Sequence, residues 1–267
     1  MLSKIYDLHT HILPGLDDGS PDIEISRAML QMAADCGTTD VFATPHIISG
    51  SYLPEWDLIL NHVEELNQFA ADAGLGIRIQ PGAEVAMDWS LLDRLPAPGS
   101  YCLGGGRFIL VELPLGSLPT YVDEFLFTLQ ARDFQIVLAH PERSPQVKKN
   151  PARLQPWLDA GMFVQINASS LTGKMGIHTQ ETAVTLLETG RVNFIGSDAH
   201  GVGMRRPDLR EAALILERIL GEEGARMVLD TNPAQLLANL PDEIRFPLIT
   251  PHPKRRWTDR LSSLWRK

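Results

Sequence analysis

Short apolar runs alternate along the chain with longer segments of mixed polarity. The short runs are rich in β-branched and aliphatic residues, whereas the longer segments repeat apolar residues at a helical period. This alternation is typical of repeated βα units. It predicts seven strands, at residues 4–9, 40–46, 77–84, 107–113, 135–140, 163–167 and 192–198. Between them, segments 21–37 and 54–74 open with proline and close on glycine, as helices tend to.

Composition is that of a folded protein with a substantial core, since 44% of the 267 residues are hydrophobic and 21% are charged. No linker-like stretch precedes about residue 240, so we expect one domain over residues 1–240 and a basic tail over 241–267. The net charge of −9 argues against nucleic-acid binding. Two cysteines, no secretory leader and no apolar run of membrane-spanning length favour a cytoplasmic protein.

Six of the seven predicted strands finish on a side chain that can bind a metal ion. In a barrel of parallel strands, the C-terminal ends converge on the face that carries the active site. One such side chain alone is more often a hydrogen-bonding group or a helix cap, but their conjunction predicts a metal centre. Its candidate ligands are His9, His11, Asp18, His46, Glu84, Glu112, His140, Asp198 and His200.

Two further polar residues close to these candidates in the sequence are not expected to bind metal. Asp17 is expected to form a turn with Gly19. Asn167, which ends the sixth predicted strand, either hydrogen-bonds a metal ligand or caps the following loop.

Five histidines and four carboxylates are too many ligands for a single ion. They imply two or three divalent ions, and nitrogen and oxygen ligands without thiolate suit manganese, iron or zinc. Such ions lower the pKa of bound water and can hold the oxygens of a phosphoryl group, which makes phosphoester hydrolysis the leading chemistry. Arg143 follows His140 and Arg205 follows His200 on the same face, so both could hold phosphate, with Arg206 as an adjacent competitor.

The motifs DLHTHILPGLDDG, ATPH, PGAE, VELP, AHPER and GSDAH occur in this order over roughly residues 4 to 240. Together they resemble the bacterial protein-tyrosine phosphatases of the polymerase and histidinol phosphatase (PHP) superfamily. This resemblance implies an α/β fold, specifically a distorted (β/α)7 barrel, with three ions that are usually manganese and a metal-bound hydroxide as nucleophile. It also implies that the nine candidate residues are the ligands and that Arg143 and Arg205 hold the phosphate.

The same resemblance implies a phosphotyrosine-containing protein as substrate, namely a tyrosine kinase that regulates capsular or exopolysaccharide synthesis. The loop at residues 47–54 lacks the basic residues of some relatives. A histidinol-phosphate type of small-molecule phosphatase would use nearly the same ligands, and a non-catalytic adaptor that binds phosphotyrosine or the kinase is a second alternative. A metal-dependent nuclease is disfavoured by the acidic charge, and an amidohydrolase would commonly have a carboxylated lysine where Glu112 stands.

A cysteine-based phosphatase is the other alternative for phosphotyrosine chemistry. The sequence CLGGGRF resembles a Cys-x5-Arg phosphate loop, but Arg107 comes one position too early and Phe108 stands where the arginine belongs. His62 and His178 are expected at the surface or at an interface, and Cys36 in the core.

The C-terminal segment 252–267 carries a net charge of +5 in this acidic chain. Trp257, Leu261, Leu264 and Trp265 recur at a helical spacing, which predicts a basic amphipathic helix. Such a helix could lie on an anionic membrane surface, or pack on its own barrel or on another subunit of a homo-oligomer.

Overall fold

The structure is a computed structural model that describes residues 4–247, and its strands are all parallel to their neighbours. Two sheets are present, with the strand orders β1-β2-β4 and β3-β5-β6-β7-β8-β9. The strands are β1 (Tyr6–Thr10), β2 (Asp40–Ala43), β3 (His46–Ile47), β4 (Arg78–Pro81), β5 (Glu84–Ala86), β6 (Phe108–Glu112), β7 (Gln135–Ala139), β8 (Phe163–Asn167) and β9 (Phe194–Gly196).

The sheet arrangement follows the seven predicted strands, with two differences. The predicted strand 40–46 is divided into β2 and β3, and the predicted strand 77–84 into β4 and β5. Pro45 has no N–H for the ladder, which ends β2 before it. Gly82 marks the second break, where an added Cβ would lie 2.9 Å from Leu103 Cδ2. Each break shifts the chain from the three-stranded sheet to the six-stranded one.

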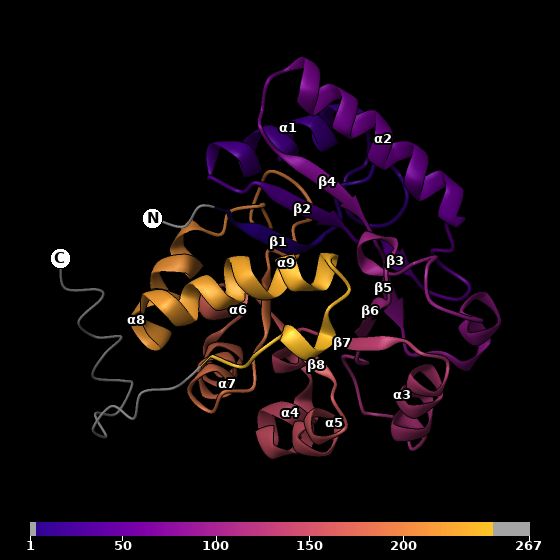
Figure 1. Cartoon of the computed structure of the whole chain (residues 1–267), viewed down its shortest axis with the longest axis vertical. Coiled ribbons are helices and arrows are strands. Elements are labelled where there is room, and N and C mark those ends of the chain that lie inside the picture. The colour runs from indigo at the N-terminus through magenta and orange to yellow at the C-terminus, as the bar shows by residue number, and fades with distance from the viewer. Residues whose placement is uncertain (1–3, 248–267) are drawn as a thin grey trace.

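The two sheets close into a barrel because the last strand returns to the first. Thr10 and Ala199 form a parallel bridge, the His11 amide donates to the Ala199 carbonyl at 2.8 Å, and the Asp198 amide donates to the His9 carbonyl at 2.8 Å. The expected (β/α)7 barrel is therefore confirmed. Figure 1 shows its strands in the middle of the molecule with the helices around them.

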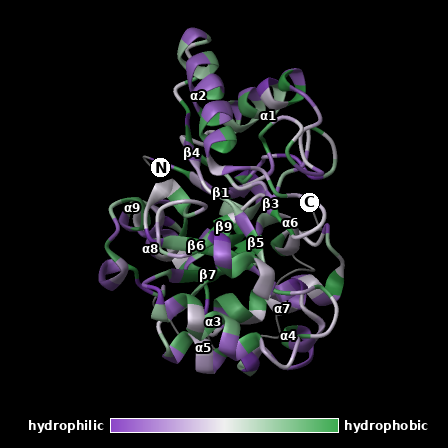
Figure 2. Ribbon diagram, turned by 90° about the vertical axis from the view of Figure 1, so that its right-hand side faces the viewer, coloured by the Kyte–Doolittle hydropathy of each residue, from purple (hydrophilic) through white to green (hydrophobic). Residues whose placement is uncertain are grey.

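The helices of the described residues lie on the outside of this barrel, with α1 and α2 over the three-stranded sheet (Figure 1). They are α1 (Ile23–Asp35), α2 (Trp56–Asp72), α3 (Val122–Ala131), α4 (Pro145–Lys149), α5 (Gln155–Asp159), α6 (Ala168–Leu171), α7 (Ile177–Glu188), α8 (Arg210–Arg226) and α9 (Asn232–Leu237). Figure 2 shows hydrophobic and hydrophilic turns alternating along the outer helices, as expected where one face packs on the strands.

The first helix shows how local sequence sets its ends. Asp22 is the N-cap of α1, and its side chain accepts a hydrogen bond from the Ile25 amide. Pro21 therefore precedes the cap instead of occupying the first turn. Gly37 follows the helix at a φ of +87°, a conformation that favours glycine after a helix end.

Alternation along the strands separates two cores. Residues such as Ile109 and Val111 belong to the larger core that also includes residues of the helices, whereas Phe108 and Leu110 belong to a smaller cluster joining strands across the barrel. Glu112 continues the inner row of β6, two residues after Leu110. The interior of the barrel is therefore apolar along the strands and polar at their C-terminal ends.

The barrel contacts extend beyond residue 240. Ile244 is buried in the smaller cluster, and the Asn232 side chain hydrogen-bonds the backbone of Arg245. The division into a domain at 1–240 and a tail at 241–267 stays a proposal, and the predicted amphipathic helix at 252–267 lies outside the described residues. Within residues 4–247, none of the helices has the length and hydropathy needed to cross a bilayer.

Candidate metal centre

The predicted metal ligands come together at the C-terminal ends of the strands. His9 lies in β1 and Glu112 ends β6. His140 directly follows β7, and Asp198 lies two residues after the end of β9. His46 and Glu84 begin the short strands β3 and β5, beyond the two strand breaks. The remaining three, His11, Asp18 and His200, lie on loops that leave β1 and β9.

These nine side chains form four overlapping groups, in each of which one ligand atom per residue lies within 4.8 Å of the others. The groups are His11, Asp18, His46 and His200; His9, His11 and Glu84; His9, His140 and Asp198; and His46, Glu84 and Glu112. Because members are shared, the groups make one continuous cluster. Each group has the donor types that bind a divalent transition-metal ion.

Glu84 lies at the middle of the cluster and is buried. Its Oε2 is 3.2 Å from His9 Nε2, 3.4 Å from His11 Nε2 and 3.0 Å from His46 Nδ1. Its Oε1 is 2.8 Å from His140 Nε2. One carboxylate thus faces four imidazoles.

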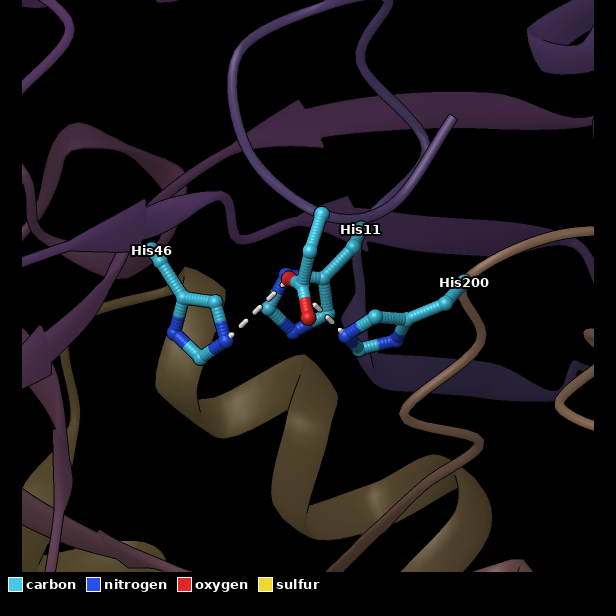
Figure 3. Close-up of side chains that lie close together, drawn as sticks. His11, His46 and His200 are labelled. Carbon is cyan, nitrogen blue, oxygen red and sulfur yellow. Dashed lines mark ion pairs between the residues drawn. The ribbon is translucent and has the colours of Figure 1, made fainter. Parts of the chain in front are cut away.

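The outer part of the cluster is more open to solvent. Figure 3 shows His11, His46 and His200 turned toward one another, and its dashed lines mark the ion pairs. Asp18 Oδ1 lies 3.6 Å from His46 Nε2 and 3.4 Å from His200 Nε2. The Asp18 side chain is 50% exposed, so this group is the part of the cluster that a ligand can reach from solvent.

The donor atoms fit bound cations. Among the described residues, Glu84 Oε2, His46 Nδ1 and His200 Nε2 are buried and make no hydrogen bond. A buried polar atom without a hydrogen bond is costly, whereas an ion about 2.1 Å from each of two ligand atoms would place those atoms roughly 3 Å apart. The Nε2 atoms of His9 and His11 are 3.1 Å apart. The residues present therefore fit divalent metal ions.

Burial and opposite charge together set the pKa values in the cluster. Burial opposes the charged form of every group, but the imidazoles hold the pKa values of Glu84 and Asp198 well below their usual range. Burial alone would lower the pKa of His140, but the negative charge of Glu84 and its hydrogen bond to the ring raise it. Burial raises the pKa of Glu112, aided by the charge of Glu84. Burial and the charge of His11 lower the pKa of His200 to about 4.

Both predicted phosphate-binding arginines lie at the edge of the cluster and contact Asp198. Arg143 Nη1 donates to Asp198 Oδ2 at 3.1 Å, and Arg205 Nη2 donates to Asp198 Oδ1 at 2.7 Å. Arg206 instead pairs with Asp208 at 3.3 Å, outside the cluster. Of the two adjacent arginines, Arg205 is therefore the one that faces the candidate metal centre.

Sequence analysis missed two buried side chains that hold the histidines. Asp17 Oδ2 lies 2.6 Å from His11 Nδ1, and Gln165 Oε1 lies 3.2 Å from His9 Nδ1. Asp17 is thus more than the turn residue that we expected, although its Oδ1 does accept from the Gly19 amide. Gln165 sits two residues before Asn167 on β8, so a strand period of two was the signal that could have found it.

Two histidines and one cysteine that were not predicted as ligands lie away from the cluster. The side chains of His62 and His178 pair with glutamates on their own helices, Glu65 and Glu181. Cys102 is buried in the core and lies in the loop that enters β6, at the opposite end of that strand from Glu112. A cysteine phosphate loop at this position is wrong on geometry as well as on spacing.

Similarity to known proteins covers most of the chain. A family model described as capsular polysaccharide synthesis, CpsB/CapC, matches residues 5–238. The tyrosine-protein phosphatase YwqE of Bacillus subtilis is 31% identical over 250 residues, which are 94% of this chain and 96% of YwqE. The putative tyrosine-protein phosphatase CapC of Staphylococcus aureus is 28% identical over 199 residues, which are 74% of this chain and 78% of CapC.

Solved structures give the same picture. A chain from the crystal structures of YwqE from Bacillus subtilis and CpsB from Streptococcus pneumoniae, described as unique metal-dependent tyrosine phosphatases, matches with a TM-score of 0.81 and 29% identity. That match covers 94% of this chain and 100% of the other. The histidinol phosphate phosphatase of Lactococcus lactis matches with a TM-score of 0.52 and 15% identity over 80% of this chain and 93% of the other, a likeness of fold alone.

Proposed function

Since the chain belongs to the CpsB/CapC family of capsular polysaccharide synthesis proteins, we propose that it is a metal-dependent protein-tyrosine phosphatase. The observation that carries this proposal is the cluster of nine donor side chains, with buried ligand atoms that make no hydrogen bond among the described residues. It is supported by the alignment with YwqE, a tyrosine-protein phosphatase, over nearly the whole of both chains.

We propose that the nine residues hold two or three divalent ions, most readily Mn²⁺, with iron and zinc as alternatives. The mixed imidazole and carboxylate donors support this choice, because the cluster contains no thiolate. When bound, such ions lower the pKa of a coordinated water and neutralise charge on phosphoryl oxygens. Because the imidazoles must be deprotonated to bind, metal affinity should rise with pH.

The chain itself supplies the phosphate-binding groups. Arg143 and Arg205 each use one nitrogen to contact Asp198, and a guanidinium has further N–H donors with which it can bind phosphate oxygens. Their side chains are 17% and 36% exposed, so the free donors are accessible from solvent. In our proposal, the arginines orient the phosphate group over the cluster and stabilise negative charge as it develops.

The proposed substrate is phosphotyrosine in a protein, and we propose a tyrosine kinase of polysaccharide synthesis as that protein. A histidinol-phosphate type of substrate and a non-catalytic adaptor are the competing functions. The complete donor set argues against the adaptor, because an adaptor would have no need of so many buried ligand atoms.

The test is hydrolysis by purified full-length protein. We expect p-nitrophenyl phosphate and a phosphotyrosine peptide to be hydrolysed with added Mn²⁺, and EDTA to abolish both activities. His62→Ala is a matched control, since this histidine lies on α2 outside the cluster. Turnover of histidinol phosphate in preference to the peptide would favour the small-molecule function. Tight phosphotyrosine binding without hydrolysis, with any divalent metal, would favour the adaptor.

We also propose a cytoplasmic location, which the two free cysteines support, and contact of the basic tail with anionic membrane. Segment 252–267 has a net charge of +5, and each basic residue near an anionic surface contributes roughly 1 kcal/mol. Full-length protein should sediment with anionic but not neutral liposomes, whereas a truncation ending at Leu248 should not. If both chains sediment equally, the tail does not bind membrane. The remaining alternatives are then that it packs on its own barrel or on a second subunit of a homo-oligomer.

A further inference from the structure

β8 contributes no predicted ligand to the metal centre, yet its two inward polar side chains reach the cluster. Gln165 and Asn167 lie on the same face of this strand and are both fully buried. A buried primary amide needs partners for its donors and its acceptor. The partners of these two amides include three predicted ligands.

Gln165 holds two histidines through one oxygen. Its Oε1 lies 3.2 Å from His9 Nδ1 and accepts from the His140 backbone amide at 3.3 Å. Since the amide oxygen can only accept, Nδ1 of His9 must carry a proton. In the neutral ring, Nε2, which faces Glu84 and His11, is then the nitrogen with the free lone pair.

Asn167 holds one carboxylate oxygen. Its Nδ2 donates to Asp198 Oδ2 at 2.7 Å, while its Oδ1 accepts from Gln165 Nε2 at 2.9 Å. Its backbone amide donates to the buried Glu142 Oε1 at 2.9 Å. Because the two amides bond each other, turning one of them round would break contacts at both ends of the pair.

Two of the three ligands that the amides contact have an unusual backbone conformation. His140 has a φ of +29° and Asp198 a φ of +53°. Residues other than glycine seldom adopt positive φ, and such conformations persist where surrounding contacts fix them. The Gln165 oxygen fixes the His140 amide, and the Asn167 side chain fixes the Asp198 carboxylate.

We propose that Gln165 and Asn167 act as a pair of positioning residues for the metal centre. Gln165 sets the tautomer of His9 and the backbone position of His140. Asn167 hydrogen-bonds Asp198 Oδ2. The other oxygen, Oδ1, is then the one turned toward His9 and His11. This inference rests on the proposed function in one respect, namely that these residues are metal ligands. It assigns β8 the role of orienting ligands that it does not itself supply.

The first test compares Gln165→Leu and Asn167→Leu with the wild-type chain by calorimetric titration of Mn²⁺ into metal-free protein. We expect the Kd to rise about 10- to 100-fold in each variant. Asn193→Leu is the matched control, because Asn193 is also a buried amide and bonds the β8 backbone at Val164, but not the cluster. It should lower the Tm and leave the Kd unchanged. Kd values within about twofold of wild type in both leucine variants would overturn the proposal.

A second measurement does not require metal. Nitrogen-15 NMR of metal-free protein should detect His9 protonated at Nδ1 in the wild type and a mixture of tautomers in Gln165→Leu. Gln165→Glu, which keeps an acceptor oxygen, should retain the Nδ1 proton. If the wild type neither binds Mn²⁺ nor hydrolyses phosphotyrosine, the proposed function fails, and the NMR comparison still decides the positioning role. The same His9 tautomer in wild type and Gln165→Leu would overturn it.

Discussion

Asp17 Oδ2 lies 2.6 Å from His11 Nδ1 and also accepts a hydrogen bond from the His46 backbone amide at 2.9 Å. One buried carboxylate thus links His11, on the loop after β1, with His46, which begins β3. Burial alone would raise the pKa of Asp17, but the contact with His11 and the backbone amides lowers it to about 2. Gly19 makes this geometry accessible, since an added Cβ would lie 2.2 Å from the His11 carbonyl oxygen.

Asp17→Ala should weaken metal binding although Asp17 is not a predicted ligand. Without the carboxylate, His11 Nδ1 has no fixed partner and the ring can rotate or change tautomer. We expect the Kd for Mn²⁺ to rise about 10- to 100-fold, with a parallel loss of kcat/KM at limiting metal. Calorimetric titration and p-nitrophenyl phosphate hydrolysis measure the two effects.

The control for Asp17→Ala is Asp72→Ala. Asp72 ends α2, and its Oδ1 accepts a hydrogen bond from the exposed Gln68 side chain at 2.9 Å. This variant removes the same charge far from the cluster, so its metal affinity should match wild type. If both variants bind Mn²⁺ equally well, Asp17 is merely a turn residue.

Asp198→Ala and His140→Ala should each lower kcat by several orders of magnitude while leaving the protein folded. Both side chains belong to the group that also includes His9, so removing either one opens a shared coordination site. Circular dichroism and hydrolysis of p-nitrophenyl phosphate should be measured on the same preparations. A folded variant with a near-normal rate would remove that residue from the proposed centre.

The fold and the convergence of the candidate ligands could be read from the sequence because both follow from simple periodicities. Parallel strands in chain order place all C-terminal ends on one face, so His9, Glu112, His140 and Asp198 come together without any knowledge of packing. The family motifs then supplied the expected barrel, which the closure between Thr10 and Ala199 confirms. The ligand roles of these residues stay a prediction.

Other features depend on packing that the sequence does not reveal. The division of the second and third predicted strands comes from local breaks at Pro45 and Gly82. The role of Gln165 depends on a contact with His9, 156 positions away in the chain. That of Asp17 depends on how the loop after β1 folds back, which brings Asp17 onto His11 and onto the His46 amide, 29 positions away. The choice of Arg205 over Arg206 depends on which of two neighbouring side chains turns inward.

Thiol alkylation should leave the activity intact. Cys102 is fully buried, and burial raises the pKa of its thiol to about 11, so the reactive thiolate is scarce at neutral pH. We expect iodoacetamide at pH 7 to leave p-nitrophenyl phosphate hydrolysis unchanged, and Cys102→Ala to retain near-wild-type kcat. EDTA should abolish the activity of the same samples. Loss of activity on alkylation, with EDTA having no effect, would favour a cysteine nucleophile.

Arg143→Lys and Arg205→Lys should each lower kcat/KM for a phosphotyrosine peptide by about 100-fold, the cost typical of losing one oriented donor to a developing negative charge. Lysine keeps the positive charge but cannot make the two-pronged contact of a guanidinium. It also cannot hold Asp198 and phosphate through separate, rigidly oriented nitrogens, as we propose for these two arginines. Steady-state kinetics at saturating Mn²⁺ measures the loss.

Arg206→Lys is the control for both variants, and it is closely matched to Arg205→Lys. It makes the same substitution one residue from Arg205, on a side chain that pairs with Asp208. Its kcat/KM should stay within about twofold of wild type, since an exposed ion pair contributes little. The contrast between neighbouring positions separates phosphate binding from a general effect of charge or loop stability. If Arg206→Lys is as impaired as Arg205→Lys, the loop as a whole, and not the inward guanidinium, supports activity.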